Sequence, residues 1–137
     1  MAWKEFRYSN HLQGNGIAYR PIVSVEIKNG VYSYTGLGLI DSGTDGIIMD
    51  IEIAKVLNLS LQGAEEVSLA GVGTAKGLIV ESVLNFDFLE LEESIAAPVV
   101  IVENMPLGIL LGQRDFFERF DIRFEKRKKK FFIRTAE

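Results

Sequence analysis

The apolar residues of this chain fall in short runs separated by polar and glycine-containing turns, a pattern typical of strands. Isoleucine and valine dominate the segment from Arg20 to Ile27, and Asn29-Gly30 then supplies a two-residue turn signal. A second predicted strand, from Val31 to Ile40, completes a hairpin. This hairpin places an acidic residue, Asp41, directly after its second strand.

The segment that follows Asp41 predicts a short strand and a helix. The run Ile47-Ile48-Met49 has the composition of a buried strand. Asp50 can then cap a helix that extends to about Leu57, because an aspartate side chain accepts hydrogen bonds from the free N–H groups of a first helical turn. Glu52 lies in that first turn, where the helix dipole favours a negative charge.

The second half of the chain predicts further strands around a glycine-rich stretch, Ala70 to Gly77. This stretch suits a mobile hairpin tip, because glycine adopts backbone conformations that are closed to other residues. A buried strand is predicted at Leu107–Gly112, and a short helix that buries three phenylalanines at Gln113–Phe120. The other strands are predicted at Glu66–Leu69, Leu78–Leu84, Phe86–Leu91, Pro98–Val102, Phe120–Phe124 and Phe131–Arg134.

The composition is that of a globular protein with one core, so residues 1–137 are expected to form a single domain. Apolar residues make up 47% and charged residues 25% of the chain. A net charge of −4 gives no general attraction to nucleic acid or to an anionic membrane. No run approaches the roughly 18 apolar residues that a membrane span needs. The N-terminus lacks the apolar run of a signal peptide, so a cytoplasmic location is expected.

Several classes of chemistry are excluded by the residue counts. The chain has no cysteine and a single histidine, His11, which lies in a polar segment and is interpreted as a surface residue. Thiolate zinc sites, cysteine nucleophiles and histidine-rich zinc hydrolase sites are therefore excluded. A serine–histidine triad would need His11 as its base, and the interpretation of His11 as a surface residue argues against that. A carboxylate mechanism needs none of these groups.

The most specific local motif is Leu39-Ile40-Asp41-Ser42-Gly43-Thr44. An acidic residue after apolar strand residues loses hydration free energy unless hydrogen bonds or a partner compensate. Ser42 can supply a hydroxyl group, and Gly43 allows another backbone to approach closely. A purely structural alternative is a strand-ending aspartate in an Asx-turn, which is common in proteins.

A second motif, Ile109-Leu-Leu-Gly112 followed by Gln-Arg-Asp-Phe-Phe, changes this interpretation. Together with the glycine-rich stretch, the two motifs resemble the retropepsin-like (retroviral-type) aspartic proteases. That family has an apolar pair before Asp-Thr/Ser-Gly, then a glycine-tipped flap, then an apolar pair before glycine and a short helix. The resemblance covers roughly residues 20–132.

The resemblance implies an all-β fold, a closed β-barrel with one or two short helices and a flap hairpin. It implies that Asp41 is the catalytic carboxylate, supported by Ser42, Gly43, Thr44 and Asp45. In this comparison Ser42 ties two active-site loops together across a dimer axis, and Gly43 accepts the substrate backbone. The residues assigned to substrate contact by the same resemblance are Gly71, Val72 and Gly73 in the flap and Leu110 in a side-chain pocket.

One position departs from the family pattern. Asp45 matches a family aspartate that often pairs with an arginine directly after the glycine. In this chain Gln113 follows Gly112, and the arginine comes next, as Arg114. An ion pair between Asp45 and Arg114 is therefore left open by the sequence.

A single Asp-Ser-Gly supplies half of a carboxylate pair. Hydrolysis by this chemistry needs one protonated and one ionised carboxyl group that share a water molecule. The chain is therefore expected to form a homodimer in which two copies of Asp41 meet on the two-fold axis, with a peptide or protein as substrate and no cofactor or metal. The terminal segments Trp3–Tyr8 and Phe131–Arg134 are expected to contribute unpaired strand edges to the dimer.

Three alternatives come from other parts of the pattern. Asp41 to Gly46, with Glu52, nearly fits a calcium-binding loop, but Gly43 replaces an oxygen ligand and a strand precedes the loop. The basic run Lys126–Lys130 could bind phosphates, although a solvated hairpin tip is the simpler interpretation, and no nucleic-acid partner is expected. Finally, the same barrel could serve as a non-catalytic dimerisation or peptide-binding module.

Overall fold

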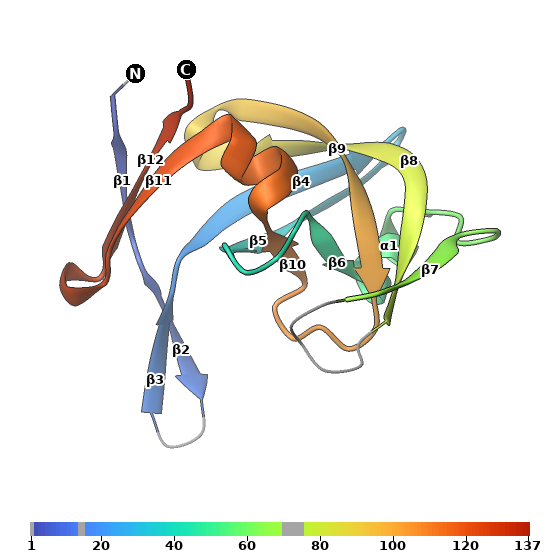
Figure 1. Ribbon diagram of the computed structural model, residues 1–137, viewed down its shortest axis with the longest axis horizontal. Coiled ribbons are helices and arrows are strands. Elements are labelled where there is room, and N and C mark those ends of the chain that lie inside the picture. Colours follow the sequence, from blue (N-terminus) through green and yellow to red (C-terminus); the bar gives the residue numbers. More distant parts are fainter. Residues whose placement is uncertain (1, 14–15, 70–75) are drawn as a thin grey trace.

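The computed structural model describes residues 2–13, 16–69 and 76–137 (Figure 1). The strands are β1 (Lys4–Arg7), β2 (Ser9–Gln13), β3 (Gly16–Arg20), β4 (Ile22–Asn29), β5 (Tyr32–Ile40), β6 (Ile48–Asp50), β7 (Glu65–Ser68), β8 (Lys76–Phe88), β9 (Glu93–Val102), β10 (Ile109–Leu111), β11 (Phe120–Glu125) and β12 (Lys130–Thr135). The helical segments are α1 (Ile51–Val56) and three short turns, η1 (Leu89–Leu91), η2 (Gln113–Phe117) and η3 (Lys126–Lys128).

Six strands close into a barrel, in the order β4, β5, β10, β6, β9 and β8, with β4 and β8 paired to complete the ring. The expected all-β closed barrel with few short helices is thereby confirmed. Most neighbours are antiparallel, but β10 runs parallel to β5, and β6 runs parallel to β9. Because β5 and β10 are parallel neighbours, the residues that follow them emerge at the same edge of the barrel.

Aromatic packing holds the chain after β10 against the barrel. The ring of Phe116 lies 5.1 Å from that of Phe88 and 5.0 Å from that of Phe120, measured between centroids. All three side chains are buried in the main core. Removing one buried phenylalanine side chain typically costs about 3–5 kcal/mol, so this cluster fixes the segment that carries Gln113 and Arg114.

The hairpin of β4 and β5 forms as predicted, with its turn one residue later than expected. Asn29 pairs with Tyr32, so Gly30 and Val31 make the two-residue connection. Gly30 has a φ of +60°, whereas Val31 is not in the left-handed region. Glycine in the first of the two turn positions meets the requirement for positive φ there, and valine then needs no strained conformation.

Two separate strands were predicted where the structure has one. β8 runs through Phe88, and η1 replaces the end of the predicted strand Phe86–Leu91. The register of β8 on β9 shifts between Val80, which faces Val99, and Leu84, which faces Ala97. Three residues of β8 thus oppose Pro98. Proline has no N–H to donate to the ladder, so the regular pairing is interrupted at Pro98. The bulge takes up this interruption, and β8 therefore bends at this place rather than ending.

The helix predicted for Gln113–Phe120 is wrong in its first half. Arg114 has extended backbone angles, and Asp115 has a φ of +73°. Helical geometry follows only after Asp115, whose backbone N–H donates to Glu118 Oε1 at 2.9 Å. This contact is one half of a capping box, in which an acidic residue three positions later closes the start of the helix. Burial raises the pKa of the Asp115 carboxyl at this bend.

The chain ends form a sheet of their own, in the order β1, β12, β11, beside the barrel (Figure 1). Ile133 of β12 pairs with Lys4 on one side and with Ile122 on the other. The expectation that Phe131–Arg134 offers an unpaired edge is therefore wrong for Phe131 to Ile133, because both edges of these residues are used within the chain. A further hairpin of β2 and β3 was not predicted, since its polar segment carries a weak strand signal.

A pH-dependent contribution to stability arises on the barrel surface. The Ser94 hydroxyl donates to Asp87 and, with the nearby Lys28 ammonium, lowers the pKa of that carboxyl. Because the pKa is lower in the folded state, ionised Asp87 stabilises the fold above the unfolded pKa, and this stabilisation is lost as pH falls through the folded value. Ser94→Ala should therefore reduce the free energy of unfolding near pH 7 by less than about 1 kcal/mol, given the exposed site.

Urea titrations of Ser94→Ala and wild type near neutral pH and at successively lower pH check this expectation, since Asp87 becomes protonated in the folded protein as pH falls through its lowered pKa. The difference between the two proteins should shrink towards zero in acid. A difference of constant size across this range would show that the Ser94 hydroxyl acts independently of the Asp87 charge.

Candidate active site

Asp41 lies where two motifs that are far apart in the sequence come together in the structure. It directly follows β5, whose Leu39 and Ile40 pair with Leu110 and Leu111 of the parallel strand β10. The backbone N–H of Asp41 donates to the Leu111 carbonyl oxygen at 3.0 Å. The structure thus brings together the Asp41-Ser-Gly-Thr motif and the Leu110-Leu111-Gly112 motif at one edge of the barrel.

The loop after Asp41 is organised by its own short side chains. Asp41 Oδ1 accepts a hydrogen bond from the Gly43 backbone N–H at 2.8 Å, an Asx-turn. The Thr44 hydroxyl donates to the Asp41 carbonyl oxygen at 3.1 Å. No other residue in the described part of the chain donates to the Asp41 carboxylate, which is partly exposed. Its second oxygen is therefore open to water or to a partner.

Three hydrogen bonds from the segment after β10 fix the same loop from the other side. The backbone N–H of Gln113 donates to the Thr44 carbonyl oxygen at 2.9 Å, and that of Arg114 to the Asp45 carbonyl oxygen at 2.8 Å. The Gln113 side chain donates through Nε2 to the Ser42 carbonyl oxygen at 2.8 Å. These bonds leave the Ser42 side chain and Gly43 exposed on the outer side of the loop.

Gly112 explains why the two segments can approach so closely. A Cβ atom at this position would lie 2.5 Å from the Thr44 carbonyl oxygen, and equally close to the Thr44 hydroxyl and the Gly46 carbonyl oxygen. The backbone angles of Gly112 are extended and open to any residue. The requirement for glycine is therefore one of space, in line with its role at close backbone approaches.

Comparisons with known proteins agree with this arrangement at the level of the fold. No protein-family model matches the sequence, and no curated protein matches it. Among solved structures, the chain is similar to the crystal structure of a retropepsin-like aspartic protease from Rickettsia conorii, with a TM-score of 0.64. The match covers 96% of this chain and 91% of that chain at 17% sequence identity. The chain has the retropepsin-like fold.

The Asp45–Arg114 ion pair suggested by the resemblance is not formed between these described residues. Arg114 has an extended backbone, and its guanidinium lies against Gly46, with Nη2 3.0 Å from where a Cβ would stand. Gln113, in the position of the family arginine, instead reaches Ser42. The sequence carried no signal for this contact, because glutamine there departs from the family pattern.

Only some of the predicted substrate-contact residues belong to the part of the chain that the structure describes. Gly71, Val72 and Gly73 lie outside the described residues. The strands that lead to them, β7 and β8, form the hairpin expected for a flap in this fold, with Ser68 paired to Lys76. Gly77, predicted in the hairpin tip, belongs to β8 and is buried.

Leu110 lies on the opposite face of β10 from the core. Its neighbours Ile109 and Leu111 are fully buried, whereas Leu110 is only partly covered. Alternate residues of a strand point to opposite faces, so the Leu110 side chain lies on the outward face with its partner Leu39. The placement provides an apolar surface near Asp41.

The residues of the calcium-loop alternative do not gather around a common point. The Glu52 carboxylate, twelfth in that pattern, pairs with Lys55 Nζ at 3.1 Å in α1. Among the described residues, no three His, Cys, Asp or Glu side chains converge in a way that could hold a metal ion. The same part of the chain has no helix long and apolar enough to cross a membrane.

The basic run of the sequence lies at the turn between β11 and β12, beside two tyrosines. Lys126 Nζ is 4.8 Å from the centroid of the Tyr8 ring, and Lys129 Nζ is 4.4 Å from that of Tyr19. The Lys126 side chain also donates to the Tyr19 carbonyl oxygen at 2.8 Å. Part of this positive charge therefore has a structural role in holding the turn against β3.

Proposed function

We propose that this chain is an aspartic endopeptidase that hydrolyses peptide bonds as a homodimer, with Asp41 of each copy in a shared carboxylate pair. The observation that carries the proposal is the hydrogen bonding of the Asp41 carboxylate at the edge of a retropepsin-like barrel. One carboxylate oxygen is held by the Gly43 N–H at 2.8 Å, and the other has no partner among the described residues. In this proposal residues 1–137 form one protease domain.

The chemistry requires the two carboxyl groups to differ in protonation. Two adjacent carboxylates repel each other, so the pair keeps one proton over a wide pH range and titrates as a unit. The ionised Asp41 removes a proton from the shared water molecule, while the protonated Asp41 polarises the peptide carbonyl. The sequence has one Asp-Ser-Gly motif, so the second carboxyl group comes from a second copy across a two-fold axis.

The neighbours of Asp41 take supporting roles in this proposal. The Ser42 hydroxyl, exposed on one chain, bonds to the partner's loop across the axis. Gly43 accepts the substrate backbone, and Thr44 and Asp45 hold the loop in place through the bonds described above. Leu110 lines a side-chain pocket, and Gly71, Val72 and Gly73 close over the peptide as the flap tip. No metal or cofactor takes part.

Digestion of a peptide library between about pH 3 and pH 7 tests the proposal, with the Asp41→Asn protein as control. Cleavage should decline as pH rises past the upper apparent pKa of the pair, because the second carboxyl group then loses its proton. A statine-type peptide should inhibit the cleavage. Turnover that rises steadily towards neutral pH would rule out the shared-proton mechanism.

A non-catalytic binding module of the same fold is the second candidate. One observation favours it, because the Asx-turn to Gly43 gives Asp41 a structural role that does not depend on catalysis. The same library distinguishes the candidates. A binding module would retain peptides without producing new termini, and it would retain them equally well after Asp41→Asn.

A further inference from the structure

A groove with apolar and acidic lining residues lies beside the segment that leads into β10. Residues 103–108 connect β9 to β10, and Met105, Pro106 and Leu107 of this connection line one wall of a groove of about 380 Å³, which Asp50 and Glu52 also line. Tyr34 and Leu37 of β5 line the same groove, and Leu37 is 51% exposed. The position of this wall depends on the hydrogen bonds that hold residues 103–108 against the rest of the chain.

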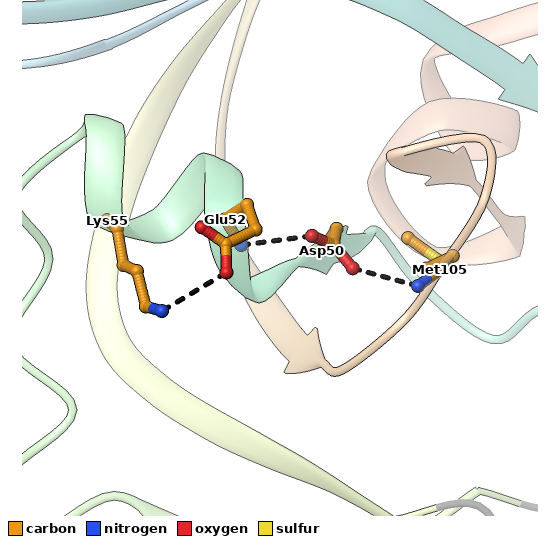
Figure 2. A network of polar contacts seen from close by, with 4 residues as sticks. All are labelled: Asp50, Glu52, Lys55 and Met105. Atoms are coloured by element: carbon orange, nitrogen blue, oxygen red, sulfur yellow. Dashed lines mark hydrogen bonds and ion pairs between the residues drawn. The ribbon is translucent and has the colours of Figure 1, made fainter.

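Asp50 holds the connection at two points. Its backbone N–H donates to the Gly108 carbonyl oxygen at 2.8 Å. Its Oδ1 accepts from the Met105 backbone N–H at 2.8 Å (Figure 2). Within the connection, the Gly108 N–H donates to the Met105 carbonyl oxygen at 3.1 Å. One residue therefore fixes both ends of the four-residue turn from Met105 to Gly108.

The second carboxylate oxygen of Asp50 makes a separate hydrogen bond. Oδ2 accepts from the Glu52 N–H at 3.0 Å and caps α1, while Glu52 pairs with Lys55 on the helix surface (Figure 2). A serine would cap the helix about as well as aspartate does. The two N–H groups bond to two different carboxylate oxygens, and serine has a single side-chain oxygen one bond closer to the backbone, so it is expected to keep the cap and lose Met105. The hydrogen bond from the Met105 N–H to Asp50 therefore needs Oδ1, the oxygen of the carboxylate that helix capping does not use.

We propose that Asp50 is a positioning residue for substrate binding, whose side chain holds the groove wall in the turn that leads, two residues beyond Gly108, to Leu110. This inference rests on the proposed protease function. Asp41 is held by Leu111 and Gly43, and Asp50 takes no part in those bonds. Loss of the Asp50 hold should therefore weaken substrate binding while leaving the chemical step nearly unchanged.

Two variants separate positioning from helix capping. Asp50→Ser keeps the cap and loses the bond to Met105, whereas Asp50→Ala loses both. Asp50→Ala should lower the melting temperature more than Asp50→Ser, because it loses the helix cap in addition to the bond to Met105. Both variants should raise KM by about 3- to 10-fold, with kcat within about 2-fold of wild type. Hydrogen exchange of the Met105 amide should accelerate about 10-fold in both, because its hydrogen-bond acceptor is gone.

The exchange measurement keeps this inference separable from the proposed function. Unchanged protection of the Met105 amide in Asp50→Ser overturns the inference, whether or not the chain cleaves peptides. Faster exchange of the Met105 amide with an unchanged KM would show that Asp50 holds the turn, and it would overturn the role of Asp50 in substrate binding. An inactive wild-type protein would refute the proposed function, and the Met105 exchange rate would still decide whether Asp50 holds the turn.

Discussion

Replacing Asp41 with asparagine is expected to abolish peptide hydrolysis and leave the fold intact. The amide keeps an oxygen that can accept the Gly43 N–H, so the Asx-turn should survive. It can neither remove a proton from water nor share one with its partner. Acid–base groups of this kind contribute about 10²- to 10⁴-fold to the rate, and turnover should fall by at least that factor. Rates on one fluorogenic peptide, with melting temperatures, measure both effects.

Asp87→Asn is the matched control, because it makes the same chemical change on the barrel surface and preserves an acceptor for Ser94. It should keep wild-type turnover. Wild-type turnover in both Asp41→Asn and Asp87→Asn would refute the catalytic role of Asp41. A parallel loss of activity in both would point to a general effect of removing a negative charge.

Gly112→Ala is expected to cause the second largest change, in stability and activity together. Its methyl group would lie 2.5 Å from the Thr44 carbonyl oxygen, and backbone atoms cannot move aside without shifting the Asp41 loop. Overpacking of this kind costs about 1–3 kcal/mol, and the upper half of that range is expected here. The urea midpoint should fall with an unchanged m-value, and peptide cleavage should be lost with it.

Gly16→Ala provides the control for this change. Gly16 is exposed, and a methyl group at that position would have no atom of the described residues within 4 Å. Its urea midpoint and turnover should match the wild type. If Gly112→Ala also behaves as wild type, the close contact between the two motif-bearing segments does not hold the loop in place.

Local signals in the sequence predicted those elements whose geometry is set locally. The β4–β5 hairpin follows from a glycine turn, and α1 follows from the cap at Asp50, which the structure confirms. The bulge in β8 was not predicted, although Pro98 was visible. A proline in one strand indicates a bulge only when the partner strand and its register are known.

The segment after Gly112 shows why part of the candidate site could not be predicted. Its backbone is held at one end by the bond from Arg114 to Asp45 and at the other by the buried ring of Phe116. These two tertiary constraints place Asp115 at positive φ between them, against its intrinsic preference. The sequence showed which two motifs would meet, but it could not show that Gln113, rather than an arginine, would join them.

The most direct test of the central claim is the activity of mixed dimers. Wild-type chain is exchanged with increasing fractions of Asp41→Asn chain, and the cleavage rate is measured at constant total protein. If each active site needs Asp41 from both copies, activity follows the square of the wild-type fraction, falling to about one quarter in an equal mixture. A fall to only about one half, in proportion to the wild-type fraction, would contradict the shared carboxylate pair.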